Sequence, residues 1–520
     1  MAVCRAAPLA AALLACASLA RAQEAVPAEA LEPASAPAVA EPGPRARPRL
    51  SSDEKALLAR PDRQRFDDGP TLPLFGRPLI FGAQYTLLTR GEDRRLAKNG
   101  ATLDYARLNQ SLAIDVFYPY TEQVSVFLQG RLINRNLIWS SQDNPDSTWD
   151  TELGEAWLFL GSLFETPLSL QVGRQRIFDE REWWWDQEFD AVRLHFDQDR
   201  VHAQASVSDS LAPVSTDLDQ QNQPEDQDML RGFGRVMFEW APKQQVGLYG
   251  LHQHDHSAAY SPGQILHKSD EDPSDGDLTW LGLSANGQRS LARFGKLAYW
   301  LDGAYVWGDE TYYKFQGKSC CRELLAKNIF ENQVRGWGLD VGATWELPLP
   351  GRPALTLSYA RGSGQRQMTQ AQNTGFRQTG VQNNNDAWTG VDRFKYYGEI
   401  LQPDLSNLEI LSAGIGLRML RKSSIQLAYH YSRQVEAAPF LFDSNLSADP
   451  DGNHRAIGQE WDLILGVEEW KHVRLELIGG IFRAGKAFGP IPGGTAGKDR
   501  LESQAGDLSY LGIFEVRLAF

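Results

Sequence analysis

The chain has few cysteines, histidines and methionines: four Cys, nine His and five Met in 520 residues. Cys320 and Cys321 are adjacent in KSCCREL, where two neighbouring thiols form a vicinal disulfide or stay idle and make a poor metal site. Beyond the first two dozen residues, no segment supplies the ~20 consecutive apolar residues of a membrane-spanning helix. These absences exclude a helical membrane bundle and predict no cofactor and no metal site, with calcium in the loops left open.

The first residues predict export from the cytoplasm. The stretch MAVCRAAPLAAALLACASLARAQ has Arg5 near its start, an apolar run and an Ala-Arg-Ala cleavage pattern, which is typical of a secretory signal peptide over residues 1–22. A lipoprotein-type cleavage before Cys16 is the alternative. Residues 23–70 are rich in Pro, Ala and Glu without hydrophobic periodicity, so we expect a flexible periplasmic segment. The folded domain is then residues 71–520.

Period-two alternation of apolar and polar residues predicts that this domain is all-β. Eighteen candidate strands lie at 79–90, 101–117, 121–135, 151–164, 167–177, 188–197, 200–208, 229–240, 244–253, 277–287, 293–308, 334–347, 352–361, 406–420, 422–435, 457–469, 471–484 and 505–520. Short connections such as FETP, DQDR and LRK follow every second candidate, and long polar ones, including residues 362–405, fall between. Outer-membrane barrels place short turns in the periplasm and long loops outside. The pattern predicts a transmembrane antiparallel β-barrel of about 18 strands with both termini periplasmic.

The final strand fits this interpretation. In LSYLGIFEVRLAF, Phe514, Val516, Leu518 and Phe520 share one face, and the opposite face carries mostly charge. A closed barrel has no free edge, because its last strand pairs with its first. We therefore expect this strand to close the barrel, and a terminal Phe on an amphipathic strand resembles the assembly signal of bacterial outer-membrane proteins.

Charged residues on the lumen faces indicate what the pore carries. Strand parity predicts that these arginines point inward: Arg90, Arg107, Arg131, Arg193, Arg235, Arg418, Arg474 and Arg517. The same faces carry Asp115, Glu239, Asp302, Asp340, Glu346, Asp462, Glu476 and Glu515. Many of these residues are expected to form cross-strand ion pairs that stiffen the wall. The formal charge of -14 says little about the lumen, because the loops hold much of the acid.

The segment LSLQVGRQRIF breaks the simple alternation. The apolar positions up to Val172 define a lipid-facing side of the strand, and Arg174 and Arg176 continue the same alternation. Pointing an arginine into lipid costs ~2–4 kcal/mol at the midplane of the membrane. A β-bulge at Gly173 would reset the register and turn both arginines into the lumen; otherwise they lie near the outer rim. Together with Arg193 they would form a girdle that attracts carboxylates or phosphates.

Several sequence blocks resemble the alginate export family. They are VGRQRIFDEREWWWDQEFDAVRLHF, LTWLGLSANG, YARGSG, FRQTGVQNNNDAWTG followed by DRFKYYGE, IGQEWDL and GGIFRAGKAFGP, in the family's order across residues 79–520. The resemblance implies an 18-stranded barrel in the bacterial cell outer membrane, with an Arg-lined constriction that passes a uronic-acid polysaccharide to the cell surface. The candidate pore residues are those implied by the resemblance and those from strand parity: Arg174, Arg176, Asp186, Arg361 and Arg393, then Arg131, Arg193 and Arg235.

The chain also departs from the best-known family member. Gly154-Glu155-Ala156 stands where that protein has an extra Arg before the aromatic residue, and Leu475-Glu476-Leu477-Ile478 replaces an Arg-rich stretch. Two gating segments look shortened, one to NLIWSSQDNPDSTWD and one to Glu469-Trp470-Lys471. These departures predict a lumen that is less positive and less tightly gated.

We therefore predict a channel that exports alginate or a related uronic-acid polymer. The alternative is a solute-specific uptake porin for small anions or oligosaccharides. An enzyme is not expected, because His195, His252, His254 and His256 are scattered over a strand and a loop. The expected partners are an anionic polysaccharide, outer-membrane lipid and a periplasmic tetratricopeptide-repeat scaffold lipoprotein of a secretion complex. No nucleic acid is expected, and the barrel is expected to be monomeric.

Overall fold

The structure is a computed structural model. It describes residues 69–94, 103–141, 143–209, 229–257, 260–267, 272, 274–317, 323–367, 371–446, 448–488 and 508–520. The predicted signal peptide, nearly all of the predicted flexible segment, and Cys320 and Cys321 lie outside these residues. The expectations about them, and the domain boundaries that depend on them, stay predictions.

The described residues are almost entirely β-structure. The strands are β1 (Thr71–Leu74), β2 (Arg77–Arg94), β3 (Leu103–Pro119), β4 (Val124–Ser140), β5 (Asp146–Leu160), β6 (Leu168–Phe178), β7 (Asp186–Gln198), β8 (Val201–Asp209), β9 (Met229–Ala241), β10 (Gln244–Asp255), β11 (Ile265–His267), β12 (Ser274–Ser290), β13 (Lys296–Gly317), β14 (Glu323–Glu346), β15 (Ala354–Gly362), β16 (Gln372–Asn373), β17 (Asn385–Asp386), β18 (Phe394–Lys395), β19 (Leu408–Met419), β20 (Ser423–Gln434), β21 (Ala456–Trp470), β22 (Val473–Ala484) and β23 (Leu508–Ala519). Single 3₁₀ turns lie at Leu163–Glu165, Ala292–Phe294 and Lys486–Phe488. No helix among the described residues is long and apolar enough to cross a membrane.

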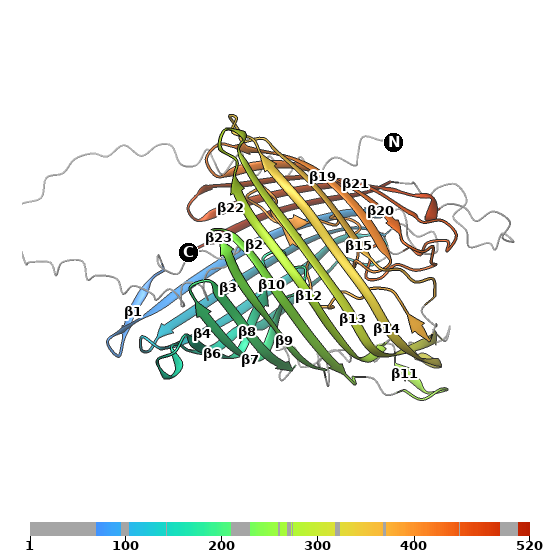
Figure 1. Ribbon diagram of the computed structural model, residues 1–520, viewed down its shortest axis with the longest axis horizontal. Coiled ribbons are helices and arrows are strands. Elements are labelled where there is room, and N and C mark those ends of the chain that lie inside the picture. The colour runs from blue at the N-terminus through green and yellow to red at the C-terminus, as the bar shows by residue number, and fades with distance from the viewer. Residues whose placement is uncertain are drawn as a thin grey trace, which may run out of the picture. The chain divides into compact units, whose positions relative to one another are not determined.

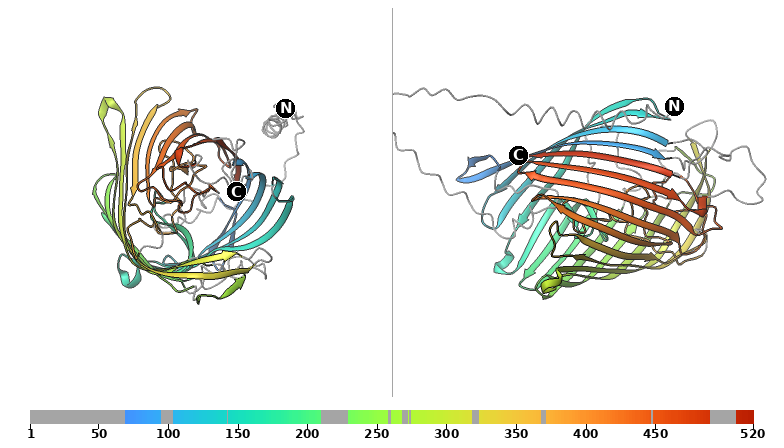
Figure 2. Two further views of the ribbon diagram at one scale, coloured as in Figure 1. Left: turned by 90° about the vertical axis from the view of Figure 1, so that its right-hand side faces the viewer. Right: turned by 90° about the horizontal axis from the view of Figure 1, so that it is seen from above.

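Eighteen of these strands form a closed antiparallel barrel (Figures 1 and 2). Each long strand pairs with the next along the chain, β10 with β12 and β15 with β19. The barrel closes between β23 and β2, where Ala519 lies opposite Gln84. Beyond that pair, Phe520 and Ala83 exchange backbone hydrogen bonds of 2.8 and 3.1 Å. The predicted fold is confirmed, since the eighteen candidate segments correspond in order to these strands.

The two faces of the wall differ as a membrane barrel requires. On β21, Leu463 is 42% exposed on the outer face, whereas the neighbouring Asp462 and Ile464 are 0% and 1% exposed inside. The same pattern recurs on the other strands, with leucine, valine and tryptophan outside. Lipid-facing positions must be apolar and lumen-facing ones can be polar. The predicted parity of β21 is therefore correct.

One part of the wall is paired over a short distance only. Strands β5 and β6 pair from Leu160 opposite Leu170 to Ala156 opposite Arg174. Beyond Ala156, β5 continues beside β4 down to Asp146 opposite Leu137. By contrast, β13 and β14 pair along nearly their whole lengths. We call the short β5–β6 pairing the seam.

The sequence predicted an outer loop for residues 362–405, between β15 and β19. This prediction is wrong for the described part of the segment, residues 363–367 and 371–407. This segment, here called the inner loop, carries β16, β17 and β18 and folds back inside the barrel (Figure 2). Phe376, Phe394 and Leu405 of the inner loop belong to one buried apolar cluster with wall residues such as Trp280 and Ile464. The loop alternates these apolar residues with polar ones, so packing against the wall is what removes them from water.

Candidate pore site

A short turn between β6 and β7, residues 179–185, enters the lumen beside the inner loop. We call it the tryptophan turn. Asp179 begins it, and its carboxylate accepts backbone N–H hydrogen bonds from Trp183, Trp184 and Trp185 at 3.0–3.3 Å. All three tryptophans are buried among aromatic residues of the wall and the inner loop. Burial raises the pKa of Asp179, although these N–H donors favour its charged form. The carboxylate therefore fixes the shape of the turn.

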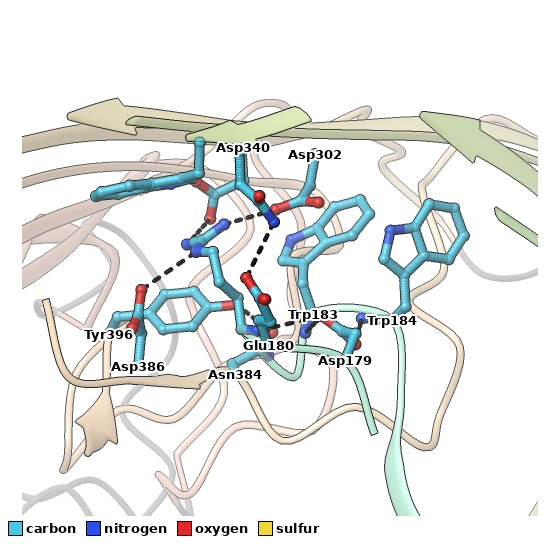
Figure 3. A network of polar contacts seen from close by, with 12 residues as sticks. Asp179, Glu180, Trp183, Trp184, Asp302, Asp340, Asn384, Asp386 and Tyr396 are labelled. Carbon is cyan, nitrogen blue, oxygen red and sulfur yellow. Dashed lines mark hydrogen bonds and ion pairs between the residues drawn. The ribbon is translucent and has the colours of Figure 1, made fainter. Parts of the chain in front are cut away.

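Arg181 joins the tryptophan turn to the wall. Its guanidinium lies 2.7 Å from Asp302 on β13 and 3.3 Å from Asp340 on β14. It also lies 3.4 Å from Asp386 of the inner loop and 4.5 Å from the ring centre of Tyr396. Figure 3 shows Asp302 and Asp340 on one side of this network and Asp386 and Tyr396 on the other. Three carboxylates around one buried guanidinium tie wall, turn and inner loop together.

Three of the predicted pore residues come together around the tryptophan turn. Arg176 makes a two-pronged ion pair with Asp186, with distances of 2.5 and 2.8 Å. Arg393 of the inner loop lies 3.1 Å from the Glu182 carboxylate, which is 3.9 Å from Arg176. Burial raises the pKa of Glu182 to about 7, with the nearby Asp186 adding to the rise and both arginines opposing it. Around neutral pH this carboxyl therefore changes charge beside two arginines.

The register shift predicted at Gly173 is absent, because β6 and β7 pair continuously from Leu168 opposite Phe196 to Phe178 opposite Asp186. The two arginines of GRQR nevertheless differ in their surroundings. Gly173 has φ 119°, and a Cβ there would lie 2.2 Å from the Ala156 carbonyl oxygen. Arg176 lines two lumen cavities. Arg174 lines neither of them and instead forms a buried pair with Asp190, at 2.8 Å. Arg174 therefore has a structural position in the wall.

The two cavities adjoin at Arg176 and Phe178, which line both. The larger has a volume of about 500 Å³, and its charged lining residues are Arg176, Arg181, Arg193, Arg235, Glu155, Asp179, Glu180, Asp197 and Asp302. The smaller has a volume of about 220 Å³ and is lined by Arg176, Arg393, Arg474, Arg517, Glu182 and Glu476, besides Phe178 and Asn385. Five carboxylates face four arginines in the larger cavity, whereas four arginines face two carboxylates in the smaller one.

The remaining predicted pore residues occupy different places. Arg193 and Arg235 line the larger cavity, Arg193 with Gln204 as a hydrogen-bond partner and Arg235 at 3.5 Å from the Tyr249 hydroxyl. Arg131 forms an ion pair with Glu188 across the seam. Both acidic residues that depart from the family pattern, Glu155 and Glu476, line cavities.

Arg361 does not point into the lumen, which corrects the prediction from the YARGSG motif. Its neighbours on β15 show the reason: Leu357 is 66% exposed and Thr356 is 3% exposed, so odd-numbered positions face outward. Arg361 lies above the outward-facing ring of Trp337, at 5.8 Å from its centre. Strand parity alone would have placed this residue correctly.

The inner loop is held by carboxylates that sequence reasoning did not select. Glu460 of β21 accepts backbone hydrogen bonds from Ile400 and Leu401, at 2.5 and 3.1 Å. Asp392 of the loop pairs with Arg474 of β22. Sequence parity placed Arg474 in the lumen, but its partner lies in a segment expected outside the barrel, so no local signal could have joined them.

Among the described residues, one group has ligand atoms close enough together to hold a metal ion: His254, His256 and Asp277. All three side chains are exposed, at the ends of β10 and β12 and away from the two cavities. The lumen site itself is built from ion pairs. The prediction that no cofactor is needed stays a prediction.

A closed barrel that is apolar outside and charged inside defines a channel protein of the outer membrane. The chain belongs to the alginate export family, whose model, described as alginate export, matches residues 77–500. Family and fold are those of a non-enzymatic channel and place the chain in the bacterial outer membrane, as predicted.

The chain is similar to three alginate production proteins. The alginate production protein AlgE of Pseudomonas aeruginosa is 28% identical over 65% of this chain and 70% of its own length. The AlgE proteins of Pseudomonas syringae pv. tomato and Azotobacter vinelandii are 27% and 25% identical, over 60% and 56% of this chain and 64% and 61% of their own lengths. Among solved structures, OccK5 (OpdH) and OprD of Pseudomonas aeruginosa each have a TM-score of 0.48 and 10% identity; they cover 85% of this chain and 97% and 95% of their own.

Proposed function

We propose that this chain exports an anionic exopolysaccharide, alginate or a related uronic-acid polymer, through the lumen beside the tryptophan turn. The observation that carries this proposal is the smaller cavity, where Arg176, Arg393, Arg474 and Arg517 face two carboxylates. Guanidinium groups in a confined passage concentrate field on a carboxylate. The relatives named as alginate production proteins support a uronate as the polymer.

Transport through such a site works by exchange of partners. Arg176 is held by Asp186, and Arg393 by Glu182. A polymer carboxylate that displaces one of these side chains takes over its ion pair, so neither guanidinium is left without a counter-charge. The net attraction between the polymer and the arginines is then modest. This suits conduction, because a channel site must bind its substrate weakly enough to release it.

The proposal also covers the direction of transport and the partners of the channel. Synthesis behind the barrel would supply the drive, and attraction to the arginines would keep the polymer in the passage. Arg193 and Arg235 of the adjoining larger cavity would bind the same polymer. A periplasmic tetratricopeptide-repeat scaffold and a monomeric barrel remain predictions that follow from the family resemblance.

The test is planar-bilayer conductance of the purified barrel, with ion selectivity recorded while uronic-acid oligomers are titrated in. We expect anion preference and block by the oligomers, with both strongly reduced in Arg176→Gln/Arg393→Gln. Arg361→Gln is the matched control, because it removes the same group from the outer face, and it should conduct like the unchanged protein.

Other outcomes decide between functions. Cation preference without oligomer block would contradict polyanion export. Block by monosaccharide acids as strong as block by long oligomers would favour the uptake porin instead, since a polymer conduit gains affinity from several successive contacts.

A further inference from the structure

A row of charged side chains lies on the outer face of the barrel, apart from the pore. Arg361 on β15 lies opposite Glu409 on β19, and Glu409 lies opposite Arg433 on β20. Arg433 bonds Glu409 at 2.7 Å, and Arg361 lies 3.9 Å from the same carboxylate. Two strands beyond β20, Arg483 of β22 is exposed on the same outer face as Ile481. Among the described residues, the row therefore has three arginines and one carboxylate.

The height of this row on the barrel matches the edge of the membrane. Arg433 lies ten residues after Ser423, where β20 begins, and Arg483 lies ten residues after Val473, where β22 begins. At about 3.3 Å per residue and a tilt of about 40°, ten residues rise about 25 Å, the height of the apolar band of such barrels. Both strands start at short turns, so the row lies at the end where the long connections begin. In outer-membrane barrels that end faces outward.

Apolar side chains lie beneath the charges on the same strands. Leu357 lies below Arg361, beyond Tyr359 on the same face, Leu411 lies below Glu409, and Ile481 lies below Arg483; all three apolar residues are exposed on the outer face. The surface thus offers cations at the level of lipid headgroups and an apolar wall at the level of acyl chains. A ligand that fits both parts has an anionic head and apolar tails.

We propose that Arg361, Arg433 and Arg483 bind the phosphate groups of a phosphorylated glycolipid of the lipid A type in the outer leaflet. The side chains of Arg361 and Arg433 are 36% and 44% exposed, against 12% for Glu409, so the guanidiniums face the surroundings while the carboxylate between them is covered. Arginine matches phosphate oxygens with paired N–H donors. Glu409 holds the two guanidiniums side by side, which lowers the cost of ordering them around a headgroup.

The exported polymer is a poorer occupant of this row. A uronic-acid chain carries carboxylates but no apolar tails, and so leaves the leucines beneath the charges uncovered. The row also lies on the opposite side of the wall from the two cavities. Binding here is therefore independent of the proposed pore function.

The experiment is a native mass spectrometry titration of the full-length protein in detergent, with bisphosphorylated lipid A and its dephosphorylated form as probes. We expect Arg361→Gln/Arg433→Gln/Arg483→Gln to weaken binding of the bisphosphorylated lipid about tenfold or more. Arg366→Gln is the matched control, since this arginine pairs with Glu436 and is 73% exposed beyond the end of β15. It should bind the lipid unchanged, as should Arg176→Gln/Arg393→Gln.

Three results would overturn the proposal: equal binding of the dephosphorylated lipid, no loss in the triple variant, or displacement of the lipid by uronic-acid oligomers. Heat-modified gel migration shows whether the triple variant still forms a closed barrel. If it does not, Arg433→Gln alone replaces it, with about threefold weaker binding expected. Conductance of the same variants separates this result from the pore: a loss of lipid binding with normal anion selectivity concerns the outer face only.

Discussion

The tryptophan turn and the inner loop both fill the lumen, but they are held in different ways. The tryptophan turn supplies its own acceptor, because Asp179 at its start receives the N–H groups of the residues that follow. The inner loop combines acceptors of its own, such as the Gln378 side chain for the Leu405 N–H, with acceptors on the wall, chiefly Glu460. A short segment can satisfy its own backbone groups, whereas a long one inside a barrel depends on residues far away in sequence. Loss of the acceptor in the tryptophan turn should therefore unfold the whole turn. Loss of a wall acceptor should make part of the inner loop more mobile while the barrel stays folded.

The largest effect is expected from Asp179→Ala. The substitution removes the acceptor for several buried N–H groups and unpacks Trp183, Trp184 and Trp185, so the free energy of unfolding should fall by about 3–5 kcal/mol. Urea unfolding in lipid vesicles measures it. Asp179→Asn keeps one acceptor oxygen and should lose about half as much. Equal stability of all three proteins would show that the turn is held by aromatic packing alone.

A smaller and more local effect is expected from Glu460→Gln. The amide nitrogen of Gln cannot accept a hydrogen bond, so either Ile400 or Leu401 loses its partner, at about 1–2 kcal/mol. Hydrogen exchange should rise about tenfold across residues 395–405 and stay unchanged in the wall strands. Glu409→Gln, a carboxylate on the outer face, is the control and should leave this segment as slow as before. Faster exchange in every strand would instead show that the inner loop supports the whole barrel.

The smallest effect concerns Glu182, which belongs to the tryptophan turn and forms an ion pair with Arg393 of the inner loop. Its pKa of about 7 is above the ordinary value of 4.5, so the folded protein binds the proton more tightly. The stability from this group is present below the ordinary pKa and is lost as pH rises through about 7. Below pH 7 the neutral carboxyl also leaves Arg176 and Arg393 with one negative neighbour fewer, so anion selectivity should be about twofold higher at pH 6 than at pH 8.

The check is Glu182→Gln, which has no charge to lose. Its selectivity should equal that of the unchanged protein at pH 6 and should not vary up to pH 8. A pH dependence that persists in this variant would assign the effect to another group near the cavities.

The barrel could be predicted because the sequence pattern that identifies each strand lies within that strand and its flanking turns. Alternation along each strand, as in Leu463 against Asp462, and the sorting of short and long connections identify strands one at a time. The inner loop could not be predicted in this way. Its position depends on contacts such as Ile400 with Glu460, between segments about 60 residues apart, and a loop of mixed polarity looks the same in sequence whether it faces water or fills a lumen.

The candidate site was predicted in part for the same reason. Gly173 was a readable signal, because it interrupts a clear lipid face and has a positive φ, but the register shift expected there is absent. The pairing of Arg174 with Asp190 was not predicted, although the two residues lie directly opposite each other on β6 and β7. For Arg361, the motif suggested the lumen, while the parity of Leu355 and Leu357 indicated the outer face, and the parity was right.

The seam gives the wall an uneven mechanical strength. Backbone hydrogen bonds carry load across a barrel wall, and the seam shares that load over the short run from Leu160 to Ala156 on β5. The neighbouring β4–β5 and β6–β7 pairings are longer. Under tension in the membrane plane, the ring would open at the seam first, into one sheet with β5 and β6 as its two edge strands. The ion pair between Arg131 and Glu188 spans the seam. It therefore joins the two sides through side chains where few backbone hydrogen bonds do so.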